Sequence, residues 1–142
     1  MSTSHYNPKN WDLVFAGYLI EGFGTNTFIS ITKDAETFTD VVGVDGRVVR
    51  GHMHDERATM EITLMQTSPS NRILSDLHAA SRAAPNGEDV AALRLVNRTG
   101  TDEHKAAEAW ILDPPDLSLE SGPTERVWKI RMAQYKATHG GQ

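Results

Sequence analysis

The strongest constraint on the fold is a change of hydrophobic period between residues 58 and 84. Apolar and polar residues alternate in the first part, so one side of an extended chain carries Ala58, Met60, Ile62 and Leu64. From residue 69 the spacing becomes helical, and one face carries Ile73, Leu74, Leu77, Ala80 and Ala84. The sequence therefore predicts a half-buried antiparallel strand over 58–65 and a helix over 69–84.

The junction between these two elements has the residues of a helix start. Ser68 is a favourable N-cap, and Pro69 suits the first helical position because its missing N–H has no partner there in any case. Pro85-Asn86-Gly87 supplies a stop signal at the other end.

A hairpin is predicted just before this strand. Val44-Asp45-Gly46-Arg47 is the signature of a two-residue type I′ turn. That turn pairs Val44 with Arg47, and Val42 with Val49. One face of the ribbon then carries Val42, Val44 and Val49, and the other carries Val41 and Val48.

This hairpin carries apolar residues on both faces, so each face must pack against another part of the structure. Either the helix covers the second face, or another subunit does, and the sequence leaves both open. The second alternative makes five valines candidate inter-subunit contacts: Val41, Val42, Val44, Val48 and Val49.

The remaining apolar runs are short and separated by turn residues. Further strands are predicted over residues 11–20, 27–32, 90–96, 107–112, 117–120 and 125–135. About seven to nine strands and one helix indicate a mainly β fold, an antiparallel β-sandwich or barrel with one flanking α-helix. We expect an N-terminal arm at 1–10, a single domain at 11–136 and a C-terminal tail at 137–142.

Composition excludes several classes of function. The absence of cysteine excludes disulfides, thiol nucleophiles and cysteine zinc sites. The net charge of −5 and the lack of any basic run argue against a protein that binds nucleic acid tightly. No signal peptide or membrane-length apolar run is apparent, so a cytoplasm-like compartment is expected.

His52-Met53-His54-Asp55-Glu56 is the cluster that most resembles a chemical site. In a strand, His52 and His54 point to the same side and so present two metal ligands. The other histidines are scattered along the sequence, and a polar bend between two strands is the preferred interpretation. We therefore expect no metal site and no cofactor.

The other short motifs have structural interpretations. Gly22-Phe23-Gly24 and Gly140-Gly141 lack the spacing of a phosphate loop, and the serines near His78 lack a nucleophile elbow. The tryptophans are core or interface anchors, and the acidic residues between 102 and 120 form a solvated face or one that repels DNA. No enzymatic activity is expected.

Taken together, several motifs resemble those of the tail tube proteins of contractile-tailed bacteriophages. The resemblance is carried by the hairpin at Gly43-Val44-Asp45-Gly46, the strand 58–65, the junction Thr67-Ser68-Pro69-Ser70-Asn71 and the paired leucines of the helix. Pro114-Pro115 and the strand containing Trp128 agree more loosely.

This resemblance implies a subunit that forms hexameric rings by joining its sheet to its neighbours, with the rings stacked into a tube for DNA ejection. It implies a virion protein assembled in the bacterial host cytoplasm. The implied partners are further copies of the chain, the tail sheath protein, the tape measure protein, baseplate and tail terminator proteins, and genomic DNA in transit, with no membrane. A type VI secretion tube, tail terminator or baseplate component is the alternative.

Overall fold

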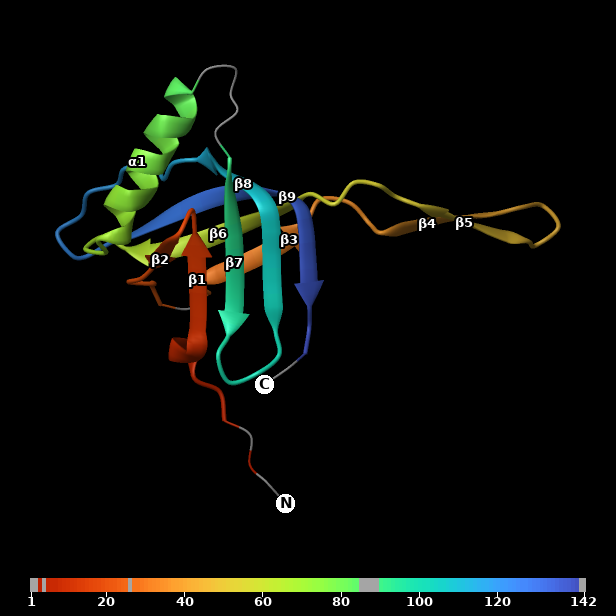
Figure 1. Cartoon of the computed structure of the whole chain (residues 1–142), viewed down its shortest axis with the longest axis horizontal. Helices are drawn as coiled ribbons and strands as arrows, with labels where there is room; N and C mark the ends of the chain where they lie inside the picture. Colours follow the sequence, from red (N-terminus) through yellow and green to blue (C-terminus); the bar gives the residue numbers. More distant parts are fainter. Residues whose placement is uncertain (1–2, 4, 26, 85–89, 141–142) are drawn as a thin grey trace.

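The computed structural model describes residues 3, 5–25, 27–84 and 90–140, and Figure 1 shows its arrangement. The predicted stop signal at residues 85–87 lies outside these ranges. The described chain contains nine strands and one α-helix, α1 (Ser70–Ala83). The strands are β1 (Trp11–Phe15), β2 (Tyr18–Ile20), β3 (Ile29–Lys33), β4 (Phe38–Val42), β5 (Val48–His52), β6 (Ala58–Met65), β7 (Ala91–Asn97), β8 (Glu103–Asp113) and β9 (Glu125–Thr138).

Seven strands form one antiparallel sheet in the order β2-β1-β7-β8-β9-β6-β3, and β4 and β5 form a separate two-stranded ribbon. The long strand β9 joins two parts of the sheet, because it pairs with β6 through Glu125–Met132 and with β8 through Lys129–Thr138. In Figure 1, β3 and β6 run across the direction of β1, β7 and β8. The sheet is therefore strongly bent, and its two parts enclose the core.

The core confirms the predicted alternation in β6. Ala58, Met60, Ile62 and Leu64 are fully buried, and they lie in one hydrophobic cluster with Trp128 and Ile130 of β9. The helix adds Leu74, which is also fully buried, and packs beside β8. The predicted class, mainly β and antiparallel with one helix, is confirmed.

The strand-to-helix junction is built from side-chain hydrogen bonds. The Ser70 N–H donates to Ser68 Oγ at 3.2 Å, so Ser68 caps the helix as predicted, with Pro69 already in helical conformation. Asn71 is buried at the same place, where its amide group donates to the carbonyl oxygens of Met65 and Ser68 and accepts a bond from Trp128. The Ser-Pro-Ser-Asn sequence thus binds the helix to the sheet.

Several predicted strands have different bounds in the structure, and the largest differences are at residues 11–20, 107–112, 117–120 and 125–135. Residues 11–20 form two strands, because Ala16 and Gly17 have φ of 54° and 84° and turn the chain between Phe15 and Tyr18. Positive φ at both central residues is the mark of a type I′ turn, which was predicted at Asp45-Gly46 and not here. Strands β8 and β9 are longer than the predicted 107–112 and 125–135. Residues 117–120 form no strand.

The predicted type I′ turn at Asp45-Gly46 is wrong, and the register shifts by one residue. Gly43 N–H donates to Arg47 O at 2.7 Å, and Gly46 N–H donates to Gly43 O at 2.9 Å. Of these residues only Gly46 has positive φ, at 86°, which is typical of a type I turn followed by a bulge. Val42 therefore pairs with Val48, and Val41 with Val49.

Gly46→Ala is expected to loosen the ribbon without unfolding the domain. A non-glycine residue in the left-handed region costs about 1–2 kcal/mol, so the β4–β5 amides should exchange with solvent roughly five- to thirtyfold faster. Hydrogen exchange of the purified chain measures this. Asp45→Asn is the matched control, since Asn also supplies a side-chain oxygen for the Arg47 N–H. Equal protection in Gly46→Ala would contradict the assigned turn.

Candidate assembly interface

The ribbon of β4 and β5 extends away from the body of the molecule (Figure 1). Every residue of both strands is exposed. The helix lies at the opposite end of the view, so the alternative in which the helix covers one face is wrong for the single chain. The five valines predicted as inter-subunit contacts are exposed by 62% to 111%: Val41, Val42, Val44, Val48 and Val49.

The corrected register gives each face of the ribbon an apolar pair. Val42 and Val48 lie on the face that also carries Phe38, and Val41 and Val49 lie on the other face. Arg50 covers part of the first face, with its guanidinium carbon 4.4 Å from the centre of the Phe38 ring. Two-stranded ribbons are only marginally stable alone in water. This one presents apolar side chains on both faces without cover from the described part of its own chain.

The root of the ribbon is fixed to the body by charged hydrogen bonds. Arg57 binds Asp55 through two contacts of 2.9 Å, and these bonds hold the pKa of Asp55 at about 2. Arg131 of β9 binds Asp34 at 2.6 Å, close to the other end of the ribbon. The ion pair between Arg131 and Asp34 therefore ties the segment that leads into the ribbon to the sheet.

His52 and His54 lie at the base of the ribbon. Their ring centroids are 4.8 Å apart, and the ring of His52 lies 5.4 Å from that of Phe38. Both histidines are exposed. Within the described residues, the group of three metal-ligand side chains that the structure brings together lies elsewhere, at Asp102, His104 and His139.

The remaining sequence candidates have structural contacts. Gly22 has a φ of 76° and packs on Ser68, and the Gly24 N–H donates to Thr63 O, so this segment is a turn beside β6. The Ser68 and Ser70 hydroxyl groups bond to the backbone of Glu21. Trp128 is a core anchor, and Trp11 packs against the core at its margin.

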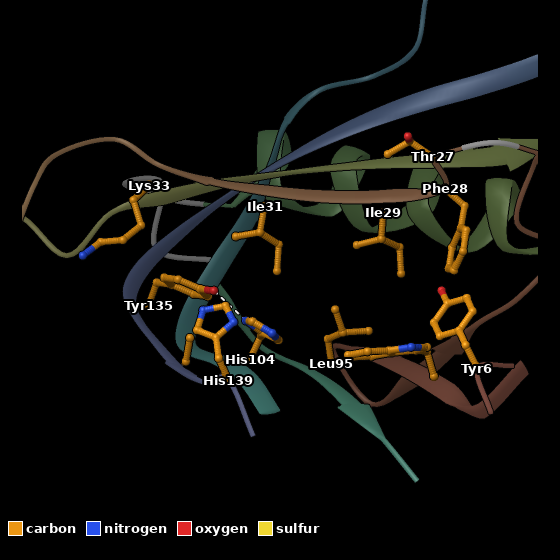
Figure 2. Close-up of a pocket in the computed structure, with 12 residues that line it drawn as sticks. Tyr6, Thr27, Phe28, Ile29, Ile31, Lys33, Leu95, His104, Tyr135 and His139 are labelled. Carbon is orange, nitrogen blue, oxygen red and sulfur yellow. Dashed lines mark hydrogen bonds between the residues drawn. The ribbon is translucent and has the colours of Figure 1, made fainter. Parts of the chain in front are cut away.

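A cavity of about 730 Å³ lies between the two parts of the bent sheet. In Figure 2, Ile29, Ile31 and Phe28 form one wall, and Leu95, His104 and Tyr135 form the facing wall. His104 is buried, and burial lowers its pKa, with the nearby His139 acting in the same direction. Burial also raises the pKa of Tyr135. Both effects favour the neutral forms of these side chains.

His104 and His139 lie outside the strands predicted over 107–112 and 125–135, since the first of these begins too late and the second ends too early. Strand β8 begins at Glu103 and β9 continues to Thr138, and these two residues are paired. The signal available in the sequence was spacing: Asp102 and His104 lie two residues apart, and Tyr135 and His139 lie four apart. Residues two apart share a face only in a strand, whereas residues four apart share a face in a strand or a helix, so this spacing is informative once both segments are known to be strands.

The fold of the described chain is shared with solved proteins of two contractile injection systems. The chain is similar to the tube-terminating cap of the anti-feeding prophage, with a TM-score of 0.65, 7% identity, and coverage of 97% of this chain and 94% of the other. It is also similar to the sheath/tube terminator of an extracellular contractile injection system, PVC, in the extended state. There the TM-score is 0.62 at 10% identity, covering 97% and 99% of the two chains.

The sequence identifies the family. Residues 15–140 match the family described as bacteriophage PhiTE tail tube protein, and the chain belongs to this family. It is also 27% identical over 145 residues to "Structural protein ORF10" of Pseudomonas phage KPP10, covering 98% of this chain and 84% of that protein. The resemblance to phage tail tube proteins is confirmed, and the family is one of non-enzymatic structural components of the phage tail.

No helix within the described residues is long and apolar enough to cross a membrane.

Proposed function

We propose that the chain is the repeating subunit of a phage tail tube, forming hexameric rings that stack into a conduit for DNA ejection. The observation that carries this proposal is the exposed ribbon with valines on both faces, in a chain of the tail tube family. Inserted against a neighbouring subunit, the ribbon buries the surface that the single chain leaves in water. The five valines are then inter-subunit contacts.

The edges of the large sheet support ring formation. Strand β2 pairs only with β1, and β3 pairs only with β6, so the described sheet has two open edges. Open edges favour addition of further strands, and cyclic closure removes them without aggregation. In the proposed ring, each subunit continues its sheet into the next.

The charge of the chain suits a conduit. A net charge of −5 gives weak attraction for phosphates, so DNA passes without being held. The proposed partners are the tail sheath protein outside the tube, the tape measure protein within it, and baseplate and terminator proteins at its ends. Assembly takes place in the host cytoplasm.

A tube terminator is the second candidate function. It is favoured by the similarity of the fold to two solved terminators over nearly the whole chain. The two functions differ in what the protein builds, because a tube subunit adds to its own rings repeatedly whereas a terminator stops at one ring.

Negative-stain microscopy of the purified, concentrated chain tests both candidates. A tube subunit is expected to give stacked rings or tubes, and sedimentation should show a series of large species. Single rings that bind only to the ends of existing tubes would favour the terminator. A chain that remains monomeric at high concentration, and also when mixed with tail sheath and baseplate proteins, would contradict both.

A further inference from the structure

The geometry points to a divalent transition-metal site, of the kind that takes Zn²⁺, formed by Asp102, His104 and His139 at the margin of the cavity. Each residue offers one ligand atom, and these atoms lie within 4.8 Å of one another. Two imidazoles and one carboxylate are ligand types that Zn²⁺ binds in proteins. This site is independent of tube assembly, because all three ligands come from one chain.

The strand register explains why these side chains meet. His104 pairs with Ala137 and Ala106 pairs with Tyr135, so these residues share one face of the sheet. Continuing the same register by one residue past the ladder brings His139 opposite Asp102. The rings of His104 and His139 are already in contact, with centroids 5.0 Å apart at an interplanar angle of 77°.

Tyr135 prepares His104 for this role. The Tyr135 hydroxyl lies 2.6 Å from His104 Nδ1, as the dashed line in Figure 2 shows. This bond occupies Nδ1 and leaves Nε2 as the nitrogen available to a metal. Histidine ligands commonly have their second nitrogen held in this way, and the outer partner sets the orientation and basicity of the ligand. Tyr135 is therefore a positioning residue.

A movement of the side chains brings the three ligands to bonding distance, and a water molecule would take the fourth position of a tetrahedral ion. Ligand atoms bonded to tetrahedral Zn²⁺ at about 2.0–2.2 Å lie roughly 3.3–3.6 Å apart, so the three groups must close in from their present limit of 4.8 Å. His139 is exposed and lies beyond the last paired residue of β9, so its side chain supplies this movement, whereas His104 is buried. The bound ion would join the C-terminal end of β9 to the start of β8.

Isothermal titration of the tag-free full chain with ZnCl₂ tests the proposal. One equivalent of Zn²⁺ is expected to bind, and Co²⁺ in its place should give visible absorption bands typical of histidine ligation. His139→Ala and Asp102→Asn should each weaken binding at least about tenfold, and Tyr135→Phe should weaken it about 10- to 100-fold. Circular dichroism establishes that each variant is folded.

The matched control is the double variant His52→Ala/His54→Ala, which removes the other adjacent histidine pair and should bind Zn²⁺ as the wild type does. A substitution of the buried His104 could prevent folding, so the test relies on His139→Ala, which changes an exposed residue. Absence of Zn²⁺ binding by the wild type, unchanged binding by folded His139→Ala, or loss of binding in the double variant would overturn the site. Unchanged affinity in Tyr135→Phe would overturn the positioning role.

Discussion

Val42→Asp is expected to abolish ring and tube formation while the isolated chain stays folded. The Val42 side chain is 62% exposed in the single chain, so the substitution removes little from the core. Surface changes of this kind usually alter stability by about 0.5 kcal/mol or less. Within the proposed interface the same position is buried by a neighbour, and the substitution puts a carboxylate there without a partner.

The expected effect on assembly is large. Burial of a valine side chain contributes about 1.5–3 kcal/mol, and an unpaired buried carboxylate adds a further penalty. Since 1.4 kcal/mol corresponds to a tenfold change in affinity, each contact should weaken by more than about a hundredfold. A closed ring repeats the contact at every subunit, so micrographs of the variant should show no rings.

Val49→Asp tests the opposite face of the ribbon. In the observed register Val49 pairs with Val41, and Val42 pairs with Val48, so the two substitutions place the charge on different faces. Loss of assembly in both variants indicates that neighbours cover both faces, and loss in one identifies the covered face. If both variants assemble as the wild type does, the ribbon is not an interface.

Val127→Asp is the control that introduces the same negative charge at an exposed valine outside the ribbon. Val127 is 42% exposed and lies on β9, outside the ribbon. It is expected to retain assembly, and the thermal midpoints of all three variants should stay close to that of the wild type. A ribbon variant that unfolds would mean that its valine supports the domain and not a neighbour.

Local patterns in the sequence predicted those parts of the fold that local physics determines. Strand β6 has its apolar residues at every second position, and the helix has a serine cap and a proline at its start, so both were predicted within a residue or two. The antiparallel class followed from the many short strands. These features depend on the period of burial and on backbone propensity, which are visible without knowledge of distant contacts.

Features that depend on contacts between distant segments were predicted less well. Ala16-Gly17 makes the type I′ turn although alanine disfavours positive φ, because Leu13 and Ile20, paired across this hairpin, are both buried in the core. Asp45-Gly46 has the better local signal but takes a longer loop. The cluster of Asp102, His104 and His139 depends on the pairing of two strand ends, and neither end has a strong apolar pattern to mark it.

The second large effect is expected from Asn71→Asp, which should lower the free energy of unfolding by about 3–5 kcal/mol near neutral pH. Asn71 is buried, its amide nitrogen lies 3.0 Å from Met65 O and 3.2 Å from Ser68 O, and its amide oxygen accepts from Trp128 Nε1 at 3.0 Å. A carboxylate keeps the bond from Trp128. It loses the bonds that the amide donates and places its charge against three carbonyl oxygens, those of Met65, Ser68 and, at 3.4 Å from the amide nitrogen, Gln66.

Chemical denaturation measures this loss of stability. The pH dependence of the loss separates the effect of the introduced negative charge from the effect of the changed side-chain shape. Burial and the facing carbonyls raise the pKa of the introduced carboxyl above its value of about 3.9 in the unfolded chain. The folded variant then binds more protons than the unfolded one, so its deficit should shrink as pH falls toward that raised pKa and below it. Asn7→Asp, the same change at an exposed position, should shift stability by about 0.5 kcal/mol or less at any of these pH values.

Asn71→Ala separates the two roles of this side chain. It introduces no charge, so its loss of stability should not depend on pH. It leaves the Trp128 N–H and the Met65 and Ser68 carbonyls without the Asn71 side chain as a partner, which costs about 1–3 kcal/mol. An Asn71→Asp variant as stable as the wild type at neutral pH would show that the junction tolerates a charge. The bonds donated by the Asn71 amide would then contribute little, and the bond accepted from Trp128, which a carboxylate keeps, would be enough to hold the helix to the sheet.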